Sequence, residues 1–149
     1  MAERELPPDF SAFLKLLNAH KVRYLVVGGY AVGVHGYPRA TGDIDIWVPM
    51  EADVADGIVG ALVDFGFDVA ALSAELFQQP DQIIRLGVPP MRIELLTTIA
   101  GVEFEDCYPR GMDTTLGGVP VRVLGLADLK INKRAAGRHQ DLADLEHLP

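Results

Sequence analysis

Two aspartates that follow a pair of glycines are the residues of this chain best suited to chemistry. The segment GGYAVGVHGYPRATGDIDIWV contains Gly28 and Gly29, and then Asp43 and Asp45. On a strand, alternation places both carboxylates on one face, with Cα atoms roughly 6.5 to 7 Å apart. Two such carboxylates repel each other unless a cation lies between them, and Mg²⁺ prefers oxygen ligands and substrate phosphates. The spacing therefore predicts a site for a metal and a phosphorylated ligand.

The elements around the glycine pair are predicted to position that ligand. Residues 22–27 are largely apolar and rich in β-branched side chains, which is typical of a buried strand, and residues 30–35 indicate a short helix stopped by Gly36. Free N–H groups at the start of that helix, unshielded at Gly28 and Gly29, would hold a phosphate, although a plain tight turn also explains the glycines. If the chain is extended before Asp43, Arg39 and Thr41 share its strand parity, and Arg39 either pairs with an acid or contacts the substrate.

A third carboxylate follows on a later predicted strand. Segments 82–86 and 92–97 flank Gly-Val-Pro-Pro and predict a strand–loop–strand unit in which Glu94 shares a face with Arg92 and Leu96. Beside Asp43, Glu94 would complete the metal site or take a proton from an attacking hydroxyl. The alternative is a salt bridge between Glu94 and a neighbouring arginine.

Cations gather near the C-terminus. Five of them fall within seventeen residues that contain one acid, Asp128: Arg122, Lys130, Lys133, Arg134 and Arg138. They form either a clamp for phosphate charge or a solvated helix face on which Lys130 and Lys133 are exposed. Helices are predicted over residues 127–136 and 140–148, with Gly137 between them and with Leu142, Leu145 and Leu148 facing inward.

The motifs together resemble the nucleotidyltransferase superfamily of the DNA polymerase β type. The glycine pair, Arg39, Thr41 and Asp-Ile-Asp fit its first motifs, and residues 86–106 resemble the stretch that carries its third carboxylate. Residues 126–148 resemble the C-terminal motif of small bacterial nucleotidyltransferases related to abortive-infection toxins. The sequence departs from the family at Glu94, where the family usually has Asp.

The resemblance implies a set of site residues. Mg²⁺ (or Mn²⁺) would be held by Asp43, Asp45 and Glu94. Lys133 matches the lysine that meets the phosphates of the nucleotide, and Arg138 and Asp141 match the basic and acidic positions after it. The nucleotide-binding set is then Gly28, Gly29, Arg39, Thr41, Lys133, Arg138 and Asp141.

Length and composition predict one α/β domain over residues 1–149, with a mixed sheet flanked by helices and two helices at the C-terminal end. The chain is 49% hydrophobic and 23% charged, its only cysteine is Cys107, and residues 1–8 do not resemble a signal peptide. We therefore expect a cytoplasmic protein without a membrane span. Helical spacing predicts a first helix with Asp9 as its N-cap and a second that ends at Gly66.

Two functions are compatible with these residues. The first is transfer of a nucleoside monophosphate from an NTP to the hydroxyl of an RNA end, a protein or a small molecule, with release of pyrophosphate. The formal charge of −8 opposes binding of extended DNA. The second is a nucleotide-binding or interaction module without catalysis, such as one half of a toxin–antitoxin-like pair. A partner protein or a second copy of the chain stays open in either case.

Overall fold

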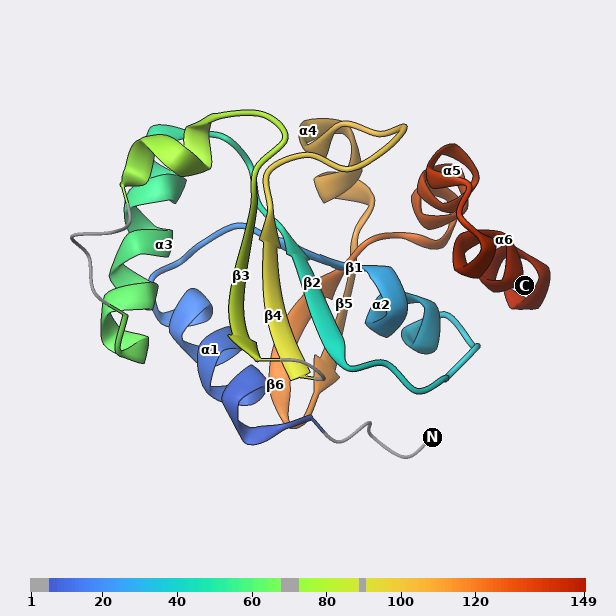
Figure 1. Ribbon diagram of the computed structural model, residues 1–149, viewed down its shortest axis with the longest axis horizontal. Helices are drawn as coiled ribbons and strands as arrows, with labels where there is room; N and C mark the ends of the chain where they lie inside the picture. Colours follow the sequence, from blue (N-terminus) through green and yellow to red (C-terminus); the bar gives the residue numbers. More distant parts are fainter. Residues whose placement is uncertain (1–5, 68–72, 89–90) are drawn as a thin grey trace.

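The structure is a computed structural model that describes residues 6–67, 73–88 and 91–149 (Figure 1). Six described strands form one sheet in the order β3-β4-β2-β1-β6-β5. Strand β2 runs parallel to β4 and antiparallel to β1, and antiparallel hairpins close both edges. The strands are β1 (Leu25–Val27), β2 (Asp43–Trp47), β3 (Ile83–Val88), β4 (Met91–Leu96), β5 (Met112–Leu116) and β6 (Val119–Val123). This confirms the predicted α/β class with a mixed sheet.

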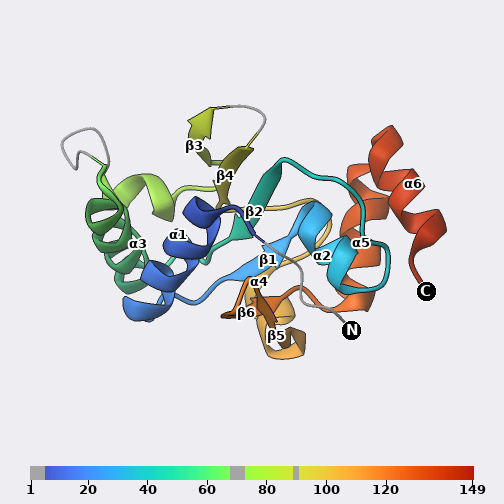
Figure 2. The same cartoon turned by 90° about the horizontal axis from the view of Figure 1, so that it is seen from below.

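The helices lie in groups on either side of the sheet. Helices α1 and α3 pack together at one side, and α5 and α6 lie at the opposite side, next to α2 (Figures 1 and 2). The helical segments are α1 (Pro8–Ala19), α2 (Gly28–Val34), α3 (Ala52–Phe65), α4 (Phe104–Cys107), α5 (Leu126–Ala136) and α6 (His139–His147), with 3-10 turns η2 (Ala74–Gln78) and η3 (Tyr108–Arg110). The strands that carry the predicted site therefore lie between the two helical groups.

Helical periodicity located α1 and α3 correctly. Phe10, Phe13 and Leu17 recur at helical spacing and are at most 2% exposed, because α1 turns that face onto the sheet and α3. The predicted N-cap was wrong, since α1 begins at Pro8 and Asp9 lies in its first turn. A proline fits the first helical position because it needs no N–H there and its φ is already helical.

The glycine pair belongs to helix α2 itself, so the prediction that this helix starts at Tyr30 was wrong. The helix begins at Gly28, directly after the last residue of β1, and no linking turn separates the two. Strand β1 is also shorter than the predicted 22–27, because its pairing with β2 begins at Leu25. The first turn of α2 therefore lies against the neighbouring strand β2.

The C-terminal helices differ from the prediction in the residues that they bury. Both occur where expected, and Gly137 between them has φ +64°, which favours glycine. The inward orientation of Leu142 was wrong: its side chain is 47% exposed, while Asp141 and Asp144 on the same helix are buried. Strand β5 and helix α4 were not predicted from the sequence.

Two predictions concern segments at the limits of the described residues. Pro89 and Pro90 of the predicted Gly-Val-Pro-Pro loop, and most of the N-terminal segment judged unlike a signal peptide, lie outside them. Within the described residues, no helix combines the length and the apolar character needed to cross a membrane.

Candidate active site

Two neighbouring parallel strands bring the three predicted carboxylates together. In the register of β2 with β4, Asp45 pairs with Glu94 and Asp43 pairs with Arg92. Alternation turns Ile44 into the core, where it is fully buried, and leaves the charged side chains on the opposite face. Asp43 and Asp45 therefore share one face of β2, and Arg92 and Glu94 share the same face of β4, as predicted.

Gly28 allows the backbone to approach this face. Its φ is +68°, a conformation that residues with a side chain rarely adopt, and a β-carbon there would lie 2.2 Å from Asp45 Oδ2. Gly29 is buried one residue further on, where a β-carbon would lie 3.0 Å from Thr41 Oγ1 and 3.3 Å from an Arg39 nitrogen. Each glycine thus makes room for a side chain from the segment that leads into or forms β2.

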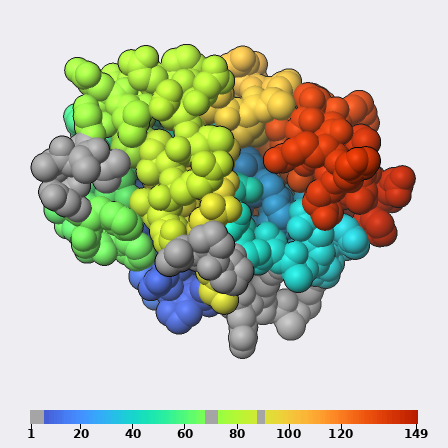
Figure 3. Space-filling view, viewed as in Figure 1, coloured from blue at the N-terminus to red at the C-terminus, as the bar shows by residue number. Residues whose placement is uncertain are grey.

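A cleft of about 530 Å³ opens over the carboxylates. It appears in Figure 3 as a hollow between the yellow-green strands β3 and β4 and the red helices α5 and α6. Among the predicted site residues, Gly28, Asp43, Asp45, Glu94, Lys133 and Arg138 line it. Four other predicted site residues do not line it: Gly29, Arg39, Thr41 and Asp141. The volume is in the range typical of small-ligand sites.

Several residues that line the cleft were not predicted as site residues from the sequence. They are mainly Arg85 and Arg92 on the hairpin, Thr98 after β4, and Asn132 on α5. Arg85 faces Glu94 directly across the β3–β4 pairing, so the hairpin alternation alone could have indicated it. Asn132 also donates from its side chain to the Ala100 carbonyl at 2.9 Å, which ties α5 to the segment after β4.

Asp45 is the electrostatically strained member of the group. Its Oδ1 is enclosed and has no hydrogen-bond partner within the described part of the chain. Burial first, and then the Glu94 and Asp43 carboxylates, raise the pKa of Asp45 to about 7, against an opposing effect of Lys133. An enclosed oxygen with excess negative charge around it favours a bound cation or a bound proton.

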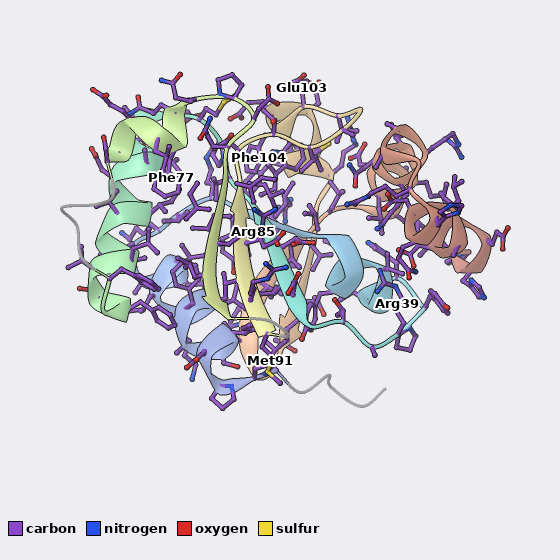
Figure 4. The ribbon with its side chains drawn as sticks, in the orientation of Figure 1. Arg39, Phe77, Arg85, Met91, Glu103 and Phe104 are labelled. Carbon is purple, nitrogen blue, oxygen red and sulfur yellow. The ribbon has the colours of Figure 1, made fainter. Side chains whose placement is uncertain are left out.

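Two arginines supply part of the missing positive charge. Arg92 Nη2 lies 3.4 Å from Asp43 Oδ2 and 3.9 Å from Glu94 Oε1. Arg85 Nε donates to Glu94 Oε1 at 3.1 Å, and Figure 4 shows Arg85 in front of the central strands. The alternative reading of Glu94 as one half of an arginine salt bridge therefore describes a contact that is present.

Two of the three predicted metal ligands are suited to hold a hard cation. No group of three His, Cys, Asp or Glu side chains in the described residues is arranged to hold a metal ion. Glu94 accepts from Arg85 at 3.1 Å and Asp43 has Arg92 only at 3.4 Å, whereas Asp45 Oδ1 has no partner in the described residues, so Asp43 and Asp45 are the less strongly paired oxygen donors. Mg²⁺ is commonly bound by one or two carboxylates together with substrate phosphates and water, so the pair with the enclosed Asp45 oxygen fits it.

Lys133 lies inside the protein, so the alternative in which Lys130 and Lys133 form an exposed pair was wrong for Lys133. Its side chain is 6% exposed, and its ammonium lies 2.9 Å from Asp141 and 3.0 Å from Asp144. Lys130 instead donates to the carbonyl of Pro149. The other cations of the predicted clamp also separate: Arg122 lies on β6 paired with Asp113, and Arg138 lines the cleft.

Comparison with known proteins agrees with this architecture. No family model and no curated protein matches the chain. Among solved structures, the chain is similar to a putative nucleotidyltransferase from Thermotoga maritima, with a TM-score of 0.57 and 15% sequence identity over 96% of this chain and 94% of that one. The chain has a nucleotidyltransferase-like fold. At this identity the likeness is one of fold alone.

Proposed function

We propose that residues 1–149 form one nucleotidyltransferase-like domain that transfers a nucleoside monophosphate from an NTP to an acceptor hydroxyl and releases pyrophosphate. The fold supports nucleotidyl transfer in general. The observation that carries the specific proposal is the placement of Asp43 and Asp45 beside Gly28 in a cleft, with Glu94 in register on the next strand. Such a site combines oxygen donors with room for a phosphorylated ligand.

The residues of the cleft divide the work of this reaction. Asp43 and Asp45 would hold Mg²⁺ or Mn²⁺, which supplies charge neutralisation and orientation for an in-line attack when it is bound. Glu94 accepts the proton of the acceptor hydroxyl, and Arg85 fixes the direction of its carboxylate at 3.1 Å. Arg92 and Arg138 face the cleft and offset the charge of the phosphates. The contribution of the protein is then mainly positioning and electrostatics.

A nucleotide-binding or interaction module without catalysis is the second candidate. The contacts of Arg92 with Asp43 and of Arg85 with Glu94 favour it, because internal cations already neutralise these carboxylates. In that case the protein would bind a nucleotide or a partner protein, as one half of a toxin–antitoxin-like pair would, without turning over NTP.

The deciding experiment is a screen of four labelled NTPs with Mg²⁺ or Mn²⁺ against tRNA, protein and small-molecule acceptors, with pyrophosphate release as the readout. Asp43→Asn should abolish release. The matched control is Asp113→Asn, which should leave release unchanged. Asp113 lies on β5 outside the cleft and, like Asp43, has an arginine partner, in this case Arg122 at 2.8 Å. NTP binding by calorimetry without release from any acceptor would favour the binding module.

A further inference from the structure

Helix α6 buries acids where an amphipathic helix would bury apolar side chains. Asp141 is 1% exposed and Asp144 is fully buried, while Leu142 between them is 47% exposed. Asp and Glu are almost never fully buried unless they are paired. The position of α6 against the body of the protein therefore depends on the partners of these two carboxylates.

The partners come from two other parts of the chain. Lys133 on α5 donates to Asp141 and lies 3.0 Å from Asp144. Arg39, from the segment before β2, donates to both oxygens of Asp144 at 2.8 and 3.0 Å. Burial alone would raise the pKa of Asp144, but the bonds from Arg39 and then Lys133 and Gln140 hold it below its ordinary value. Burial would likewise raise the pKa of Asp141, but the bonds from Arg138 and then Lys133 hold it below its ordinary value. Both carboxylates are therefore ionised and held by charge-assisted bonds.

Contacts continue from this cluster to the carboxylates of the cleft. Arg39 and Thr41 lie against Gly29, as the short distances from its β-carbon position indicate. Thr41 donates to the Asp43 carbonyl at 3.2 Å. Figure 4 shows Arg39 on the segment between α2 and β2, on the side of the molecule where α6 lies. The docking of α6 is thus connected, through side chains in contact, to the glycine pair and to the start of β2.

Buried ion pairs are an expensive way to attach a helix, since well-packed apolar residues of similar volume often stabilise as well or better. Their geometry, however, is directional: a two-oxygen bond from an arginine fixes both distance and orientation. We propose that Arg39, Lys133, Asp141 and Asp144 form an ionic lock that fixes α5 and α6 against the glycine pair and so sets the wall of the nucleotide cleft.

In this arrangement Lys133 and Asp144 are positioning residues, which act on the ligand through the residues that line the cleft. Lys133 has its ammonium held by two carboxylates, and its substitution then misplaces Asn132 and Arg138, which line the cleft. The nucleotide end of this inference rests on the proposed function. If Lys133 only positions other residues, Lys133→Ala should weaken the binding of an NTP and of the matching NMP equally. If Lys133 bonds directly to the distal phosphates, the variant should weaken NTP binding more than NMP binding.

The test compares Asp144→Asn with a matched control. Asp128→Asn removes another buried aspartate of the C-terminal helices, whose two oxygens accept from Arg110 at 3.0 Å each, outside the cleft. Hydrogen exchange by mass spectrometry reports on residues 37–42 and on both helices, and calorimetry with Mg²⁺ and each of the four NTPs and NMPs reports on the cleft. Arg39→Lys serves as a milder variant that keeps the charge and loses the two-oxygen bond.

In Asp144→Asn, exchange over residues 37–42 should rise by about tenfold or more. NTP and NMP affinity should both fall by roughly 10- to 100-fold. Arg39→Lys should change both in the same direction by less, and Asp128→Asn should leave both unchanged. Unaltered exchange over 37–42 in both lock variants, or an equal loss of affinity in Asp128→Asn, would overturn the lock. If the parent protein binds no NTP, the proposed function fails while the exchange data still decide the lock.

Discussion

Asp45→Asn should stabilise the metal-free protein at neutral pH while it removes the response to metal. The pKa of Asp45 rises from its ordinary 3.8 to about 7, chiefly through burial. At about 1.4 kcal/mol for each pKa unit, the ionised carboxylate costs up to roughly 4 kcal/mol, and closer to 2 if its partial exposure screens it. An amide carries no charge and can donate toward Glu94, so the variant should melt roughly 5 to 15 °C higher above pH 7.

The pH dependence of this gain has a definite sign. Because the folded state holds the proton of Asp45 more tightly than the unfolded state does, the parent loses stability as the pH rises from about 4 to about 7. The melting temperatures of parent and variant should therefore be nearly equal at pH 4, diverge up to pH 7 and stay parallel above it. The assay is thermal melting in EDTA across this range.

Metal addition completes the test. Mg²⁺ should raise the melting temperature of the parent by mass action and leave Asp45→Asn unchanged. Asp43→Asn is the matched control: Asp43 has an arginine at 3.4 Å and the amide loses that ion pair, so this variant should lose the Mg²⁺ response and gain less stability than Asp45→Asn. A destabilised Asp45→Asn in EDTA at pH 8, or one that responds to Mg²⁺ like the parent, would refute the electrostatic reasoning.

Three further outcomes are expected. Gly28→Ala should lose the Mg²⁺ response and melt well below Gly36→Ala, as melting curves with and without metal would show. Both glycines have positive φ, but a β-carbon at Gly28 would meet the Asp45 carboxylate, whereas one at Gly36 would meet no neighbour. Glu94→Gln should remove most turnover and keep nucleotide binding, as single-turnover assays and calorimetry would reveal, and unchanged turnover would exclude a role in proton transfer. Burial raises the pKa of the Cys107 thiol to about 11, so a thiol reagent at pH 8 should modify the native protein far more slowly than the unfolded one.

The sequence determined the elements whose pattern is local. The alternation around Ile44 and Ile46 placed Asp43 and Asp45 on one face of a strand, because successive side chains of a strand point to opposite sides. The end of α3 at Gly66 was also predicted from the sequence, since glycine adopts the left-handed conformation found there, with φ +108°, without a steric cost. These features depend on residues within a few positions of each other, and the sequence displays them directly.

Tertiary structure alone decided which charges meet. Asp144 accepts a hydrogen bond from Arg39, which is 105 residues away in sequence, and the periodicity of α6 does not indicate that partner. The helix pattern favoured Leu142 as a buried residue, but a carboxylate that two cations hold can be buried in its place. Lys133 likewise became internal through Asp141 and Asp144. The free energy of a buried charge depends on partners that only the folded chain brings within hydrogen-bond distance, and this is why the local sequence could not determine it.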